Sequence, residues 1–200
     1  MPVRDGREYR SFGAFSALEE PKGYIVEGYA TTFDAPYDMG GDGYRECISS
    51  RALDSADMSD VIFQMNHAGT PLARLRNGSM SVERDQHGLL VRADLGGCED
   101  GRRLYEAIKN GLVDRMSWAF RVADDGWTYD EATRTATIER ISKVYDVSAV
   151  SLPANEDTEI HARSYLDGVI EAEQQRESLQ RELDRARALA RLQLKLKIGA

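Results

Sequence analysis

The chain has 200 residues, a length that fits one domain of about 150 residues followed by an extension. Its formal net charge of -8 at pH 7 argues against a general nucleic-acid binder, because phosphate contacts require an excess of Lys and Arg. The two cysteines form no CxxC pair or Cys/His cluster, which argues against a disulfide scaffold or structural zinc, and no apolar run approaches the ~18 residues of a membrane span.

The first part of the chain, residues 1–20, is expected to be a flexible N-terminal arm without a signal peptide. One proline and three glycines mark a long loop at 34–43, and the segment 51–58 is a candidate for a short helix. Apolar residues at helical spacing, followed by Gly111, predict a helix at 99–110. Runs rich in β-forming residues predict strands at 23–33, 61–66, 79–84, 88–95, 115–123, 126–130, 134–142 and 144–152.

These elements predict an α+β fold for the domain at 21–162. Many short strands with two or three helices are typical of a closed or half-closed, mainly antiparallel β-barrel with helices around it.

The end of the chain, residues 163–200, is expected to be a helical extension. Between Ser164 and Ile198 there is no proline, and residues 181–200 hold six basic and two acidic side chains, a net charge of +4. Its first half is nearly all polar, so a partner or partial disorder is expected. An apolar stripe at spacings of three and four marks an amphipathic helix: Leu179, Leu183, Ala186, Ala190 and Leu194.

Three residues with catalytic potential lie on or at the end of predicted strands. His67 ends one apolar run, Ser117 lies between large hydrophobic residues in a second, and Asp146 lies within a third. In a strand Ser117 faces away from Met116 and Trp118, which leaves it on the more open face. A base, a nucleophile and an orienting acid are the groups that a serine hydrolase needs.

Ordinary structural roles would give the same pattern. Ser117 would then be a simple strand serine, and His67 a surface residue at a strand end. Asp146 would be an edge carboxylate, paired with Arg121 or Arg140. His87 belongs to a predicted turn and is expected at the surface. Acidic residues also recur through the loop at every fourth position, without the spacing of an EF-hand, and are expected to be solvated: Asp34, Asp38, Asp42 and Glu46.

Short motifs follow one another in a characteristic order over roughly two thirds of the chain. They are Gly28-Tyr29-Ala30-Thr31-Thr32-Phe33-Asp34, Tyr37-Asp38-Met39-Gly40-Gly41, Glu46-Cys47-Ile48, Asn66-His67, Gly78-Ser79-Met80-Ser81-Val82, Gly88-Leu89-Leu90-Val91, Leu104-Tyr105-Glu106-Ala107-Ile108-Lys109, Met116-Ser117-Trp118-Ala119-Phe120-Arg121, Tyr145-Asp146-Val147-Ser148-Ala149-Val150 and Pro153-Ala154. In these motifs the chain resembles the prohead maturation proteases of tailed bacteriophages, which belong with the herpesvirus assemblins. The resemblance also implies the barrel fold.

The resemblance implies a serine endopeptidase in which Ser117 attacks the scissile carbonyl, His67 transfers the proton and Asp146 orients His67. The third position is an acid in the phage members and a histidine in the viral relatives, and His161 is a rival for it here. The oxyanion hole is expected after the third strand, at the backbone N–H groups of Ala154 and Asn155. In the viral relatives arginines occupy this stretch. None is present here, but backbone donors do not depend on the side chain.

The implied substrates are the scaffold or the scaffolding segment of the capsid protein, together with the protease itself, inside the procapsid in the host cytoplasm. We expect no cofactor, no metal, and no nucleic-acid or membrane partner. The relatives often need dimerisation or high concentration, so a homo-oligomer stays open. Two other functions fit less well: a non-enzymatic capsid-assembly factor on the same fold, and a β-barrel binding module without a nucleophile.

Overall fold

The computed structural model describes residues 7–17, 23–39, 43–151, 175–176, 178–182 and 184–185. Contacts divide the chain into two units, 1–162 and 163–200. The described residues of the second unit are helical, and the side chain of Leu179 is exposed. The rest of the predicted C-terminal helix lies outside the described residues. Within the part of the chain that is described, no helix is long and apolar enough to cross a membrane.

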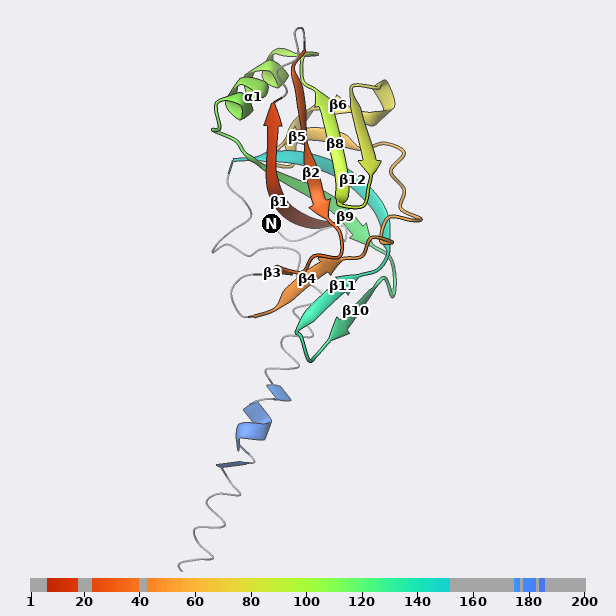
Figure 1. Ribbon diagram of the computed structural model, residues 1–200, viewed down its shortest axis with the longest axis vertical. Coiled ribbons are helices and arrows are strands. Elements are labelled where there is room, and N and C mark those ends of the chain that lie inside the picture. The colour runs from red at the N-terminus through yellow and green to blue at the C-terminus, as the bar shows by residue number, and fades with distance from the viewer. Residues whose placement is uncertain are drawn as a thin grey trace, which may run out of the picture. The chain divides into compact units, whose positions relative to one another are not determined.

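The first unit consists mainly of β-strands (Figure 1). Its described strands are β1 (Glu8–Ala17), β2 (Ile25–Thr32), β3 (Tyr37–Asp38), β4 (Arg45–Ile48), β5 (Ile62–Met65), β6 (Ala68–Arg74), β7 (Met80–Arg84), β8 (Gly88–Asp94), β9 (Arg115–Val122), β10 (Trp127–Asp130), β11 (Thr135–Ile138) and β12 (Ile141–Val150). Its described helices are the 3-10 helix η1 (Leu75–Asn77) and α1 (Glu99–Lys109).

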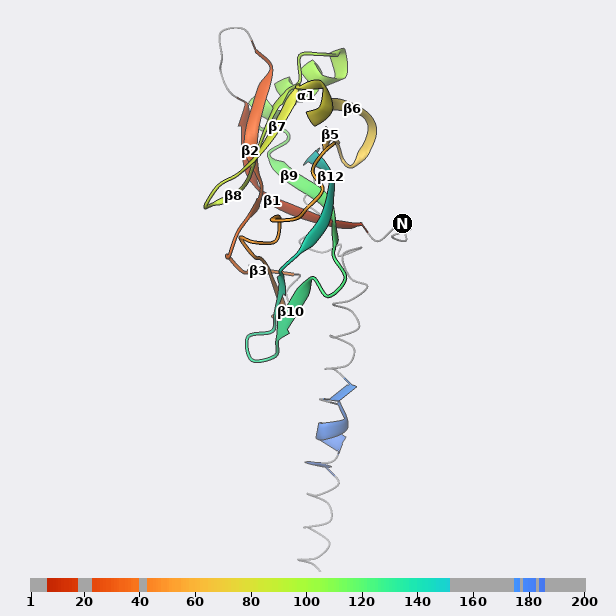
Figure 2. The same cartoon turned by 90° about the vertical axis from the view of Figure 1, so that its right-hand side faces the viewer.

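Eight strands form one sheet in the order β6-β5-β12-β9-β1-β2-β8-β7, and a second sheet has the order β10-β11-β4-β3. The pairs β5–β12 and β4–β11 are parallel, and the other pairs are antiparallel. The large sheet is strongly bent, so β2 and β8 cross in front of β9 and β12 (Figures 1 and 2). The structure therefore agrees with an α+β fold that is mostly antiparallel sheet.

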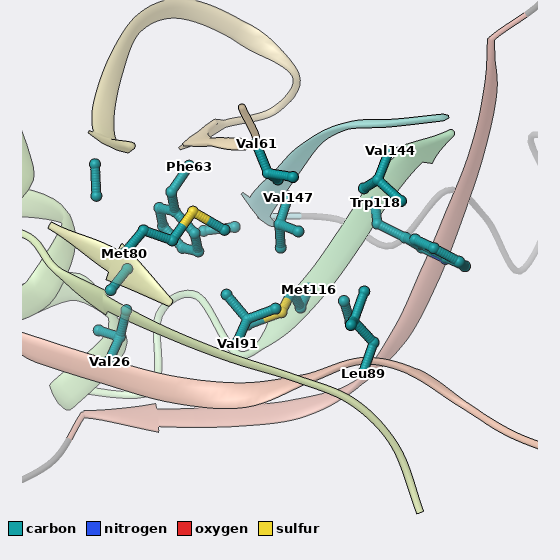
Figure 3. Packing of buried hydrophobic residues seen from close by; sticks show 14 of the residues in the cluster. Val26, Val61, Phe63, Met80, Leu89, Val91, Met116, Trp118, Val144 and Val147 are labelled. Carbon is teal, nitrogen blue, oxygen red and sulfur yellow. The ribbon is translucent and has the colours of Figure 1, made fainter. Parts of the chain in front are cut away.

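The hydrophobic core lies inside this bend. Side chains of β5, β9 and β12, such as Phe63, Trp118 and Val147, face Val26 of β2 and Leu89 of β8 (Figure 3). All five are almost completely buried. Alternation along each strand sends these side chains inward and leaves the next residue on the outer face, where the candidate site lies.

Of the two predicted forms, a closed or a half-closed barrel, the closed one is not found among the described strands. The large sheet is open, with β6 and β7 as its two edges. Pro71 lies within β6 and has no N–H to donate to a further strand, which suits an edge position. One α-helix is described in this unit, where the sequence predicted two or three.

The prediction of a flexible arm at 1–20 is wrong for residues 8–17. These residues form β1, which pairs with β2 on one side and with β9 on the other. The charged residues Glu8 and Arg10 are unusual in an interior strand, and they are tolerated here because the charge of Arg10 is compensated. Arg10 is 5% exposed and donates hydrogen bonds to Glu8 of its own strand and Glu46 of β4.

The ion pair between Arg10 and Glu46 connects β1 with the smaller sheet. Burial alone would lower the pKa of Arg10, but the carboxylates of Glu46 and Glu8 outweigh that effect and raise it. Tyr37 of β3 also donates its hydroxyl to Glu46. Burial and the Glu46 charge raise the pKa of Tyr37 well above its usual value. Glu46 is therefore a structural carboxylate and not one of a row of solvated loop acids.

The prediction of a short helix at 51–58 is also wrong, since the segment forms turns. The amide of Asp54 bonds to the carbonyl of Arg51, three residues back. Further along, Asp57 exchanges backbone hydrogen bonds with Ser142 and Val144, and its side chain pairs with Lys143 at 2.7 Å. Tertiary bonds to β12 thus replace the bonds that would continue a helix.

Candidate active site

Strand register sets the position of Ser117 on the outer face of the large sheet. Ser117 of β9 lies opposite Ser148 of β12 on one side and Ser11 of β1 on the other. Its neighbours Met116 and Trp118 point into the core and are fully buried. The predicted direction of the Ser117 side chain is therefore confirmed, although Ser117 is itself only 2% exposed.

His67 links Ser117 to Asp146. Its Nε2 lies 2.7 Å from Ser117 Oγ, and its Nδ1 lies 2.5 Å from Asp146 Oδ1. The Asp146 side chain is 4% exposed and that of His67 is 17% exposed. With the Nδ1 proton directed at the carboxylate, Nε2 is left to accept the Ser117 hydroxyl proton.

A strained turn between β5 and β6 holds His67 in this place. Asn66 and His67 both have left-handed backbones, with φ of 51° and 53°, a conformation that non-glycine residues adopt only with external support. The support comes from β12 and from Ser151, the residue that follows it. The Asn66 amide bonds to the Ala149 carbonyl at 2.9 Å, the His67 amide to Ser148 Oγ at 3.1 Å, and the Ser151 amide to Asn66 Oδ1 at 3.3 Å.

Asp146 follows an irregularity in β12, where the register with β9 shifts between Val144 and Asp146. Its carboxylate accepts hydrogen bonds from His67 and from the Ser148 hydroxyl, the latter at 3.0 Å. Arg140, an alternative partner, instead donates to backbone carbonyls of the β9–β10 connection. The guanidinium of Arg121, the other alternative, lies 5.8 Å from the centre of the Tyr145 ring.

Comparison with known proteins identifies the family. Residues 14–169 match the family described as caudovirus prohead serine protease. The chain belongs to this family. It is 31% identical over 146 residues to a protein named prohead protease from Enterobacteria phage HK97, a match covering 72% of this chain and 62% of the relative. It is 32% identical over 153 residues to the prohead protease of Escherichia phage T5, covering 75% and 68%. No solved structure matches the chain.

The chain thus spans less than two thirds of the length of its HK97 relative.

Two residues that contact the site, Tyr9 and Ser148, were not among the candidates predicted from the sequence. The Tyr9 ring of β1 lies edge-on to His67, with centroids 4.6 Å apart and planes at 73°. It was missed because its strand was predicted to be an arm. Ser148 had a detectable signal, since it lies two residues after Asp146 and therefore on the same face.

The structure places one further histidine, His87, away from this cluster, and the remaining predicted site residues are not described. Ala154, Asn155 and the rival His161 lie outside the described residues. His87 is in the turn between β7 and β8, where its ring contacts Tyr29 with centroids 4.5 Å apart. Among the described residues, no three His, Cys, Asp or Glu side chains form a group that could hold a metal ion.

Proposed function

We propose that this protein is a serine endopeptidase of phage prohead maturation, with Ser117 as nucleophile, His67 as general base and Asp146 as the orienting acid. The observation that carries the proposal is the continuous hydrogen-bonded series Asp146–His67–Ser117, built from the strands β12 and β9 and the turn after β5. Membership of the prohead protease family supports the same chemistry. A non-enzymatic assembly factor would have no need for this series.

The proposed reaction has two halves. Ser117 Oγ attacks the scissile carbonyl carbon while His67 Nε2 takes the hydroxyl proton, and the resulting imidazolium donates that proton to the leaving amine. Water then attacks the acyl-enzyme, His67 takes a proton from the water, and the Ser117 oxygen leaves with a proton returned by His67. Asp146 holds the Nδ1–H and stabilises the imidazolium in each half. Backbone N–H groups of Ala154 and Asn155 are the proposed donors to the oxyanion.

The proposed substrates are the scaffold or the scaffolding segment of the capsid protein, and the chain itself. The names of the HK97 and T5 relatives, both prohead proteases, support an action inside the procapsid. In this proposal the protease consists of β1 together with residues 21–162, and residues 163–200 form an extension that contacts the assembling shell.

The test is to compare wild-type protein with Ser117→Ala and His67→Ala after co-expression with the capsid protein. Each variant should lose processing by on the order of 10⁴–10⁶-fold, and the double variant should be hardly worse, because the two side chains act as one unit. Mass spectrometry of the N- and C-termini of both proteins measures the processing. Ser142→Ala, on the same strand as Asp146 but with its hydroxyl bonded to the Arg121 carbonyl, is the matched control. Normal processing by Ser117→Ala would end the assignment.

A further inference from the structure

The hydroxyl of Ser148 lies between the backbone and the side-chain partner of His67. It accepts the His67 backbone N–H at 3.1 Å and donates to Asp146 Oδ1 at 3.0 Å. That oxygen is the one that His67 Nδ1 approaches at 2.5 Å. One hydroxyl therefore contacts both residues that set the position of the imidazole.

Burial makes these contacts hard to replace. Ser148 is completely buried and Asp146 is 3% exposed, so bulk water does not reach the hydroxyl. A serine hydroxyl has one donor and two acceptor positions. The donor is directed to the carboxylate and one acceptor position receives the His67 amide. Removing the oxygen would leave a partly buried N–H without this acceptor and a buried carboxylate with one donor fewer.

The hydrogen bond from the His67 amide to Ser148 also stabilises an unusual backbone conformation. His67 and Asn66 are consecutive left-handed residues, and such backbones persist where the surrounding structure holds them. The Asn66 amide is fixed by a backbone carbonyl of β12, a bond that any side chain at that position would allow. The His67 amide is fixed by a side chain, so this half of the turn depends on the identity of residue 148.

We infer that Ser148 is a positioning residue, which fixes the backbone of His67 and the carboxylate of Asp146 together so that the imidazole meets Ser117. The inference rests on the proposed function, because it describes how the same site is held. Ser148 has no role in bond making: it contacts Ser117 only as its neighbour across the β9–β12 ladder. Its effect is on the activation of Ser117 and not on substrate binding.

The test measures the rate at which a fluorophosphonate labels Ser117 in the full chain, followed by mass spectrometry. Ser148→Ala should lower the maximal labelling rate by about 10- to 100-fold while the half-saturating probe concentration changes by less than about twofold. Ser142→Ala, a serine of the same strand away from the site, is the control and should label at the wild-type rate. Ser148→Cys keeps the size but offers a weak donor and acceptor, so its rate should fall between Ser148→Ala and wild type.

The pH profile of labelling separates positioning from simple loss of structure. Among the residues that the structure describes, the titratable groups in contact with the His67 ring are Asp146 from β12 and Tyr9 from β1. Without the Ser148 donor, the Asp146 carboxylate concentrates more negative charge on the oxygen facing Nδ1 and favours the imidazolium. The acid limb of the profile in Ser148→Ala should therefore move to higher pH. A folding defect alone would lower the amplitude without moving the limb.

Three outcomes would overturn the inference while leaving the proposed function intact. They are a Ser148→Ala rate within about twofold of wild type, an acid limb that does not move upward, or a Ser148→Cys rate equal to wild type. If Ser148→Ala does not fold, the Cys variant carries the test alone. If the Ser117→Ala protein were labelled at another residue at the wild-type rate, the proposed function would be overturned, and this inference with it.

Discussion

The carboxylate of Asp146 shows how one buried charge is accommodated on a mostly buried strand. Val147, the next residue, and Val144, two residues before Asp146, are fully buried, and an uncompensated carboxylate between them would be strongly unfavourable. Hydrogen bonds from His67 and Ser148 provide the compensation. The residue therefore depends on the same contacts that would orient a catalytic histidine.

Replacing Asp146 by Asn tests this role. Asp146→Asn preserves the shape of the side chain but presents an amide to His67 Nδ1 and so favours the wrong tautomer. Activity should fall by roughly 10⁴-fold while the fold is retained. Capsid-protein processing measures the activity and circular dichroism measures the fold. His161→Ala is the comparison: a near wild-type Asp146→Asn together with an inactive His161→Ala would make His161 the third member.

At the scale of elements, β1 is the strand that adds Tyr9 to the candidate site. It separates β9 from β2 in the sheet and presents Tyr9 to His67 on the outer face. Its opposite face carries Arg10, which is bound to Glu46 of β4. One strand thus contacts the candidate site on one side and the smaller sheet on the other.

Removing Glu46 should destabilise this arrangement. Glu46→Ala leaves the buried guanidinium of Arg10 without its main partner, which should lower the free energy of unfolding by about 3–5 kcal/mol. Urea unfolding followed by fluorescence measures the loss. Glu27→Ala is the control, because the pair between Glu27 and Arg92 is partly exposed at 3.7 Å and should contribute at most about 1 kcal/mol.

A double substitution checks that the charge, and not the volume, is responsible. Arg10→Met combined with Glu46→Leu removes both charges and keeps apolar volume, so it should be less destabilised than Glu46→Ala alone. A double variant that is the less stable of the two would contradict a charge-based explanation.

At the scale of the whole molecule, the two units differ in charge. Of the chain's net charge of -8, residues 163–200 contribute +2, from eight basic and six acidic side chains, and residues 1–162 contribute -10. The described part of the second unit is helical, and Leu179 is 61% exposed. We propose that this extension docks onto scaffold or capsid protein and recruits the protease. In this proposal a later cut between about 164 and 180 releases it, because the polar sequence of this segment favours local opening.

Truncation after Ser164 tests the recruiting role. Fluorophosphonate labelling of Ser117 should persist in the shortened chain, while its incorporation into procapsids should drop. Wild-type levels in procapsids would rule out recruitment, and loss of the extension from a Ser117→Ala protein would rule out self-cleavage. The alternative, a self-associating coiled coil, predicts instead that truncation changes the oligomeric state, which sedimentation velocity measures.

Local patterns predicted several elements correctly. The helix expected at 99–110 is α1, and Gly111 after it has the left-handed backbone, with φ of 68°, that a helix end favours. The alternation of side chains within one strand was enough to place Ser117 on the face of the sheet opposite to that of Met116 and Trp118. These features depend on neighbours a few residues apart, which a single sequence displays directly.

The sequence by itself therefore determined the strand-rich composition, α1, and the three residues His67, Ser117 and Asp146 as candidates. Only the tertiary structure decided that they meet, since His67 is 50 residues from Ser117 and 79 from Asp146. It also decided the open sheet, the interior position of β1, and the contacts of Ser148. The physical reason is that strand order and register are set by long-range pairing and by compensation of buried charge, and neither leaves a periodic signal along the chain.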